Sequence, residues 1–338
     1  MKSILITGGA GFIGSNLVRM LAEGSAYNVI VLDALTYAGN LENIQDLVDG
    51  SRVRFEHGSI NDRGLIDRLL AETSFDAILH LAAESHVDRS IASAAPFIET
   101  NVVGTLTLLE AAKHAAVRRF VHVSTDEVYG MLGPTDPAFT EETPLAPNSP
   151  YSASKAASDL LVRAFVHTHG MDAVITRCSN NYGPYQFPEK LIPLMTLNAI
   201  ENRSLPIYGD GLQVRDWLHV EDHCRGIMLA YERGMTGQVY NFGGFGEEKN
   251  IVVATSILQH VGKDESLLTY VADRPGHDRR YAINPRKVQQ ELGWTPEWNF
   301  KDGLRTTIDW YRANSAWCQN VRSGEYRSYY QRQYEQRG

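Results

Sequence analysis

The chain has 338 residues, of which 43% are hydrophobic and 21% charged, a balance that predicts a folded protein with a large core. Its formal net charge of -8 argues against a protein that coats nucleic acid. The three cysteines, Cys178, Cys224 and Cys318, lie far apart and predict neither a disulfide framework nor a metal site. No apolar stretch approaches the ~18 residues of a membrane span, and no targeting signal is visible, so we expect a cytoplasmic protein.

The first half of the chain alternates short apolar runs with helical periodicities. Strands are predicted at 3–7, 29–33, 53–57, 77–81, 120–124 and 173–178, and helices at 12–22, 63–71, 102–115 and 152–169. Such alternation is typical of an α/β protein with a Rossmann-like, doubly wound parallel sheet and helices on both faces.

Beyond Tyr182 this rhythm loosens. Helices are predicted at 191–202, 221–232, 252–261 and 303–313, and short strands at 205–208, 239–242 and 268–271. We therefore expect a dinucleotide-binding domain over residues 1–180 that includes the catalytic residues. Residues 181–338 are expected to form a smaller, mixed α/β substrate-binding lobe, with the chain free to cross between the two parts.

A glycine-rich turn follows the first predicted strand. Gly8, Gly11 and Gly14 are spaced so that the turn is tight and a pyrophosphate can approach the free N–H groups of the next helix. Asp33 ends the second strand, where a carboxylate can bind a ribose diol and would repel a 2′-phosphate. The pattern predicts NAD rather than NADP; a simple tight turn and an ordinary loop carboxylate are the alternatives.

Tyr151 and Lys155 lie four residues apart and share one face of a predicted helix. An ammonium group beside the phenol is expected to lower its pKa from the usual value of about 10. Such a phenol can take the proton of a sugar hydroxyl while hydride leaves the same carbon. An ordinary tyrosine with an exposed lysine is the alternative interpretation of this spacing.

Three polar residues, Thr125, Asp126 and Glu127, follow the predicted strand 120–124. Ligands of doubly wound sheets bind beyond the carboxyl ends of the strands, so these side chains are expected at a substrate. Two adjacent carboxyl groups can work as an acid and a base if their surroundings separate their pKa values. A solvated acidic turn or a helix cap would carry the same residues.

Together these segments resemble the extended short-chain dehydrogenase/reductase superfamily and, within it, the dTDP-glucose 4,6-dehydratases. The resemblance covers about residues 1–315 and rests on TGGAGFIGSN (7–16), LDALTYAGN (32–40), LAAESHVDRSI (81–91), STDEVYG (124–130), SPYSASKAASD (149–159), SNNYGPYQFPEKLIP (179–193), VRDWLHVEDHC (214–224) and RPGHDRRYAI (274–283). The Asp126-Glu127 pair is its most specific element, because related epimerases lack it.

The resemblance implies a lyase of deoxysugar biosynthesis that turns dTDP-glucose into its 4-keto-6-deoxy derivative, with NAD regenerated in every cycle. Tyr151, aided by Thr125 and Lys155, would take the proton of the glucose 4-hydroxyl while hydride passes from C4 to NAD. Glu127 would then remove the C5 proton, Asp126 would protonate the departing 6-hydroxyl, and the hydride would return to C6. It also implies a homodimer in which the helix near 101–115 and the Tyr151 helix pack against their mates.

Ligand contacts are implied residue by residue. Those for NAD are Phe12, Ile13, Asp33, Leu35, Thr36, Leu81, Ala83, Thr100, Tyr151, Lys155 and Asn181, with Ser59 and Ile60 near the adenine. Those for the sugar nucleotide are Ser85, Thr125, Asn180, Lys190, Leu191, Pro206, Tyr208, Arg215, Asn250, Arg274 and His277. Ser59 departs from the family, which usually has an acidic residue there; a hydroxyl can still accept a hydrogen bond, but without a charge.

Three other functions stay open on the sequence. A UDP-glucose 4,6-dehydratase would have the same catalytic set, because no short motif separates thymine from uracil. A UDP-sugar 4-epimerase would not need the Asp126-Glu127 pair. A dinucleotide-sensing or scaffold protein would keep the fold without the chemistry.

Overall fold

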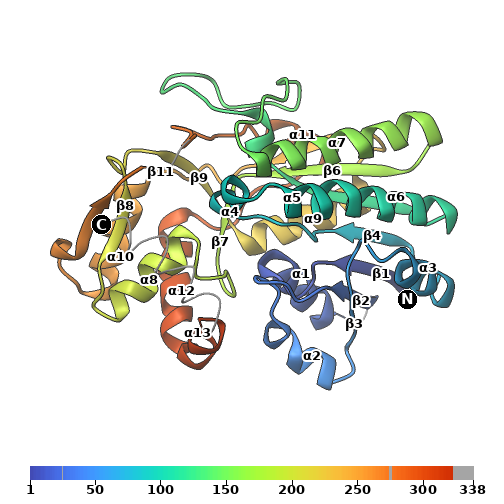
Figure 1. Ribbon diagram of the computed structural model, residues 1–338, viewed down its shortest axis with the longest axis horizontal. Coiled ribbons are helices and arrows are strands. Elements are labelled where there is room, and N and C mark those ends of the chain that lie inside the picture. The colour runs from blue at the N-terminus through green and yellow to red at the C-terminus, as the bar shows by residue number, and fades with distance from the viewer. Residues whose placement is uncertain (25, 274–275, 323–338) are drawn as a thin grey trace.

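The computed structural model describes residues 1–24, 26–273 and 276–322. Seven parallel strands form its main sheet in the order β10-β6-β5-β4-β1-β2-β3 (Figure 1). Their bounds are β1 (Lys2–Thr7), β2 (Tyr27–Asp33), β3 (Val53–His57), β4 (Ala77–His80), β5 (Arg119–Thr125), β6 (Ala173–Cys178) and β10 (Val239–Phe242). The Rossmann-like α/β fold is thereby confirmed.

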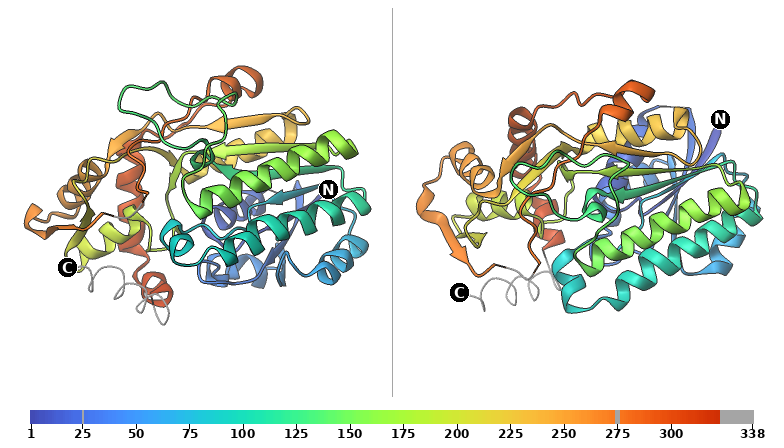
Figure 2. Two further views of the ribbon diagram at one scale, coloured as in Figure 1. Left: turned by 45° about the horizontal axis from the view of Figure 1, so that its top comes forward. Right: turned by 90° about the horizontal axis from the view of Figure 1, so that it is seen from above.

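Helices cover both faces of this sheet, so its strands are buried on both sides. Along β1, Ile4 and Ile6 face one core and Leu5 faces the other, as the two-residue period of a strand requires. The first core also contains α1 (Phe12–Glu23) and α9 (Val220–Arg233). The second contains α3 (Arg63–Glu72), α6 (Thr105–His114) and α7 (Pro150–His169), and Figure 2 shows α6 and α7 side by side.

The predicted helix 102–115 begins differently from expectation. Residues Ile98–Gly104 form a π-helical segment that runs into α6. A Cβ on Gly104 would lie 2.6 Å from the Ile60 side chain, so the segment can approach that close only with glycine there. Asn101 of this segment holds the backbone of Glu84, with its side chain accepting one hydrogen bond and donating another. Such π-helical turns are often found at functional sites.

A second group of elements lies beside the carboxyl ends of the main strands (Figure 1). It contains a three-stranded sheet, β11-β9-β7, and a two-stranded sheet, β12-β8. The strands are β7 (Asn180–Tyr182), β8 (Leu205–Tyr208), β9 (Val214–His219), β11 (Glu247–Lys249) and β12 (Leu268–Val271), and the helices are α8 (Leu191–Ile200), α10 (Asn250–Val261), α12 (Phe300–Ala313) and α13 (Ser315–Val321). Ile192, Trp217 and Ile257 are among the residues of its apolar core.

The chain crosses between these two groups. It leaves the main sheet after β6 and returns to it with α9 and β10, before α10 goes back to the smaller group. The sequence predicted strand 239–242 but placed it in the smaller lobe; it pairs instead with β6 at the edge of the main sheet. The remaining short helices are α2 (Gln45–Asp49), α4 (Val87–Ala92), α5 (Ala95–Phe97) and α11 (Arg286–Leu292), with 3-10 turns at Leu41–Asn43, Asp126–Tyr129 and Glu265–Leu267. Within the described part of the chain, no helix is both long and apolar enough to cross a membrane.

Candidate active site

Two neighbouring hollows lie at the carboxyl ends of the parallel strands. The first is lined by the turns that follow β1, β2, β3 and β4, and the second by residues of the smaller group together with residues 86–88 and Glu127. Gln186, Glu189 and Lys190 line both, so this segment is a shared wall. Doubly wound sheets bind their ligands at this edge.

The glycine turn of the first hollow has no room for side chains at two of its positions. Gly8 has φ +75°, and a Cβ there would lie 2.6 Å from the backbone nitrogen of Ala82. A Cβ on Gly14 would lie 2.1 Å from the carbonyl oxygen of Gly8. Gly11 precedes α1, and no side chain caps this helix end. The N–H groups of the first turn of α1 are therefore presented to the hollow, as a pyrophosphate needs.

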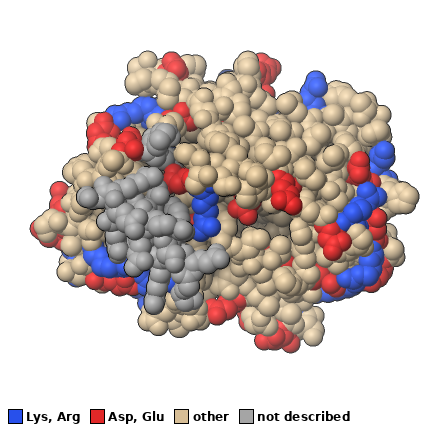
Figure 3. All heavy atoms as spheres, viewed as in Figure 1, with Lys and Arg blue, Asp and Glu red and all other residues tan. Residues whose placement is uncertain are grey.

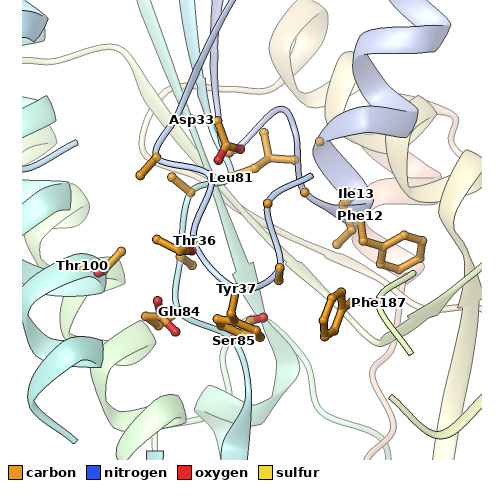
Figure 4. Close-up of a pocket in the computed structure, with 18 of the residues that line it drawn as sticks. Phe12, Ile13, Asp33, Thr36, Tyr37, Leu81, Glu84, Ser85, Thr100 and Phe187 are labelled. Carbon is orange, nitrogen blue, oxygen red and sulfur yellow. The ribbon is translucent and has the colours of Figure 1, made fainter. Parts of the chain in front are cut away.

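Asp33 is held at the end of β2 by two backbone groups. Its carboxylate accepts hydrogen bonds from the N–H of Ala10 at 2.9 Å and of Leu35 at 2.8 Å. Burial raises the pKa of Asp33, and these two hydrogen bonds act against that shift. Figure 4 shows its carboxylate at the hollow, with Thr100 on the opposite wall. The remaining acceptor capacity of the carboxylate suits a ribose diol.

Most of the predicted cofactor contacts line this first hollow. They are Gly8, Gly11, Phe12, Ile13, Gly14, Asp33, Thr36, Ser59, Ile60, Leu81, Ala83 and Thr100. Four others do not line it. Leu35 donates its backbone N–H to Asp33, Tyr151 and Lys155 lie on α7, and Asn181 lines the second hollow. The Ser59 hydroxyl accepts the N–H of Asn61 at 3.1 Å.

The acid pair follows β5 directly. Thr125 is the last residue of the strand, and its hydroxyl accepts the N–H of Glu127 at 3.3 Å. Asp126 is only 2% exposed, whereas Glu127 lines the second hollow. Burial raises the pKa of Asp126 well above its ordinary value, and the charges of Glu127 and Asp216 add to this effect. The shift favours the protonated form of the Asp126 carboxyl, which a solvated acidic turn would not do.

Tyr151 and Lys155 lie on the first turns of α7, which begins with a capping box between Ser149 and Ser152. Tyr151 and Lys155 share one face of the helix, as predicted, and both side chains are buried. The expected lowering of the tyrosine pKa is wrong for this structure: burial raises the pKa of Tyr151 well above 10, and the charge of Glu127 adds to the increase. The Lys155 ammonium donates to the carbonyl of Val123 at 2.9 Å, and burial lowers its own pKa to about 8.

The predicted substrate contacts lie mostly around the second hollow. Those that line it are Asn180, Lys190, Leu191, Pro206, Tyr208, Arg215, Asn250 and His277. Ser85 lines the first hollow instead, and Thr125 lines neither hollow but accepts the backbone N–H of Glu127. Arg274 is outside the described residues. Arg215 is buried with its guanidinium 4.5 Å from the Tyr281 ring centre, and it donates to the carbonyls of Val214 and Asp278.

Comparison with known proteins identifies the family. A family model described as GDP-mannose 4,6 dehydratase matches residues 5–307. The dTDP-glucose 4,6-dehydratase of Neisseria meningitidis serogroup B is 52% identical, over 97% of this chain and 98% of that protein. The chain belongs to the dTDP-glucose 4,6-dehydratase family.

Solved structures agree with this membership. The crystal structure of a Streptomyces venezuelae dTDP-glucose 4,6-dehydratase, which has NAD bound, is 52% identical, covers 94% of this chain and 99% of its own, and gives a TM-score of 0.91. A UDP-glucose 4-epimerase from Thermotoga maritima gives 0.87 at 30% identity, covering 93% of this chain and 99% of its own. The dehydratase and epimerase folds are thus nearly alike.

Several residues around the hollows of this dehydratase family member were not predicted. Tyr37, Glu84 and Phe187 line the first hollow, and Trp217 and Tyr281 line the second. All except Glu84 are aromatic, and Tyr37 and Phe187 meet edge to face at 5.9 Å. Each lies within a motif quoted above, but neither period nor spacing indicates that it faces a ligand.

Glu189, on the shared wall, is a further residue that sequence reasoning missed. It is 5% exposed, and burial raises its pKa to about 7. Its carboxylate lies 3.6 Å from the Arg89 guanidinium and 3.7 Å from His86. No cluster of three or more potential ligands able to hold a metal ion occurs among the described residues.

Proposed function

We propose that this protein dehydrates dTDP-glucose to dTDP-4-keto-6-deoxyglucose, with NAD as its cofactor. The observation that carries the proposal is the pairing of a buried Asp126, whose pKa burial raises, with a hollow-facing Glu127 at the end of β5. Relatives of the same name, 52% identical over almost the whole chain, support the substrate.

The first hollow fits NAD. The pyrophosphate would lie at the free N–H groups of α1, beside Gly11, and the adenosine ribose diol would bind Asp33. Ser59 and Ile60 would contact the adenine. Bound NAD supplies the hydride acceptor and brings a positive charge close to the catalytic residues.

The oxidation half of the site is formed by α7 and the end of β5. Tyr151 takes the proton of the glucose 4-hydroxyl, and Thr125 holds that hydroxyl in place. Lys155, anchored on Val123, places its charge on the same face of α7. Because burial raises the pKa of Tyr151, positive charge from Lys155 and from the cofactor is needed to favour the phenolate.

The elimination half is the acid pair. A ketone at C4 acidifies the C5 hydrogen, which the Glu127 carboxylate removes from the side of the second hollow. Asp126, whose protonated form is favoured by burial, gives its proton to the departing 6-hydroxyl, so that water leaves. A base and an acid are thereby provided by neighbouring residues in different surroundings.

The sugar nucleotide would bind in the second hollow. Lys190 lies on the wall shared with the cofactor, where its ammonium donates to the carbonyl of Ser85 at 2.9 Å. Arg215 and Asn250 would contact the diphosphate and the deoxyribose. In this proposal residues 1–180 hold NAD and the catalytic set, and residues 181–338 hold mainly the sugar nucleotide.

We also propose a homodimer in the cytoplasm. Apolar side chains are exposed on α7 and on the π-helical segment, with Leu160 56%, Ile98 46% and Val103 47% exposed. Figure 3 shows few charged side chains in the middle of this face. Light scattering should give the mass of two chains, and Leu160→Glu should shift it towards one. The three free, buried cysteines suit a reducing compartment.

A direct assay tests the reaction. Purified protein is incubated with dTDP-glucose and, separately, with UDP-glucose, without an added reductant, and product mass is measured. Loss of one water, much faster from dTDP-glucose, is expected. Preference for UDP-glucose would overturn the substrate, and isomerisation without a change in mass would overturn the elimination chemistry.

A further inference from the structure

A buried ion pair lies behind the catalytic residues and is not part of either hollow. Asp159, on α7 with Tyr151 and Lys155, is 2% exposed, and Arg177, on β6, is 5% exposed. The Arg177 Nε donates to the Asp159 Oδ2 at 2.9 Å. This hydrogen bond therefore fixes the Arg177 guanidinium to α7, the helix that carries the oxidation residues.

The other side of Arg177 contacts the turn that carries the acid pair. Its guanidinium lies 4.7 Å from the ring centre of Tyr129, the residue that ends the turn Asp126–Tyr129. The Tyr129 hydroxyl donates to the Asn241 side chain at 2.9 Å, and its ring stacks on Phe139 at 5.1 Å. The contacts with Arg177 and Asn241 hold the turn against β6 and β10.

The sheet register brings these contacts together. Arg177 is the register partner of Ser124 on β5 and of Asn241 on β10. Ser124 stands directly before the catalytic triplet. Arg177 thus occupies the strand between the one that ends in the acid pair and the one that anchors Tyr129.

The pair remains charged near neutral pH. Burial alone would raise the pKa of Asp159, but the Arg177 charge, together with hydrogen bonds from His122 and Ser124, lowers it below its ordinary value. His122 lies 3.4 Å from Asp159, and burial lowers its own pKa to about 4. A buried ion pair seldom adds stability over apolar residues of the same volume, so a positioning role is the better reason for it.

We infer that the Asp159–Arg177 pair positions the turn 126–129, which carries the acid pair, against α7. In this position the oxidation residues of α7 and the acid pair can both reach the same bound sugar. Both are positioning residues, because neither lines a hollow. The inference rests on the proposed dehydration, and it predicts that loss of the pair separates the two half-reactions.

The test is the double variant Asp159→Leu/Arg177→Met, which removes both charges together and leaves neither unpaired in the core. NAD-loaded protein is mixed rapidly with dTDP-glucose while product and the near-ultraviolet absorbance of reduced nicotinamide are followed. We expect water loss to slow about a hundredfold and C4 oxidation by less than about tenfold, so reduced nicotinamide accumulates. Arg177→Lys keeps the charge but lacks the planar group over Tyr129, and it should fall between the double variant and wild type.

The control uses a second arginine–aspartate pair, which lies at the other end of β5 and β6 from Ser124 and Arg177. Arg119 at the start of β5 and Asp172 just before β6 have the same Nε–Oδ2 contact, also at 2.9 Å. Arg119→Met/Asp172→Leu should lower the thermal stability without accumulation of reduced nicotinamide. Parallel loss of both half-reactions in the Asp159–Arg177 variant, or accumulation in the control as well, would overturn the inference. Failure of the wild type to release water would count against the proposed function instead.

Discussion

The two hollows are built by different means. The first is formed largely by backbone: glycines at the start of α1, an uncapped helix end and the turns after the first four strands. The second is formed by side chains that come from segments spread from His86 to Tyr281. We therefore expect the first to fail when a Cβ is added, and the second to fail when a functional group is removed.

The largest effect should come from the oxidation residue. Tyr151→Phe removes the hydroxyl that takes the proton, and general-base catalysis commonly contributes about 10²–10⁴-fold. We expect kcat to fall by that factor while NAD affinity, measured by calorimetry, is unchanged. Turnover within tenfold of wild type would mean that another group takes this proton.

Asp126→Asn should impair elimination selectively. The amide cannot donate a carboxyl proton, so water loss should slow about a hundredfold or more while C4 oxidation continues. The pH dependence of water loss follows from the same carboxyl group. Because burial raises the pKa of Asp126, the rate of water loss in the wild type should fall as rising pH removes this proton. A profile of the variant that keeps the same alkaline fall would assign the fall to another group.

Adding one methyl group tests the backbone-built hollow. A Cβ on Gly14 meets the Gly8 carbonyl oxygen at 2.1 Å, whereas one on Gly24, at the other end of α1, would stay 3.9 Å from the Leu21 carbonyl oxygen. Gly14→Ala should destabilise the fold by about 1–3 kcal/mol and weaken NAD binding at least about tenfold. Gly24→Ala is the control and should change both much less; equal effects in calorimetry and thermal unfolding would contradict the backbone account.

The smallest effect is expected within the side-chain-built hollow. Tyr208→Phe removes a hydroxyl that donates to Asp88 at 3.3 Å. Losing this neutral-to-charged hydrogen bond should raise KM for the sugar nucleotide by a few-fold, or about 1 kcal/mol, with kcat unchanged. Steady-state kinetics measure both, and a fall in kcat alone would instead place Tyr208 among the residues that act on the reacting atoms.

The same contrast explains what the sequence could predict. The glycine turn, Asp33 and the acid pair are local, since each lies at a strand end whose position the apolar pattern indicates. Strand 239–242 was also recognisable, but a four-residue apolar run does not say which sheet it joins.

Burial was the main quantity that the sequence could not give. The spacing of Tyr151 and Lys155 correctly placed both on one helix face, but it left out the desolvation that raises the pKa of the tyrosine. Tyr37, Phe187 and Glu189 reach the hollows through the folded path of their loops, for which no periodic signal exists. Long-range pairs such as Asp159 and Arg177 likewise become visible only with the sheet register.

The central claim is that one bound sugar is first oxidised at C4, then loses water, and is finally reduced at C6 within the same site. The most direct measurement uses dTDP-glucose labelled with deuterium at C4 and locates the label in the product by mass spectrometry and NMR. We predict a product that is lighter by one water and carries the deuterium at C6. Deuterium that stays at C4, or a product without loss of water, would contradict the account.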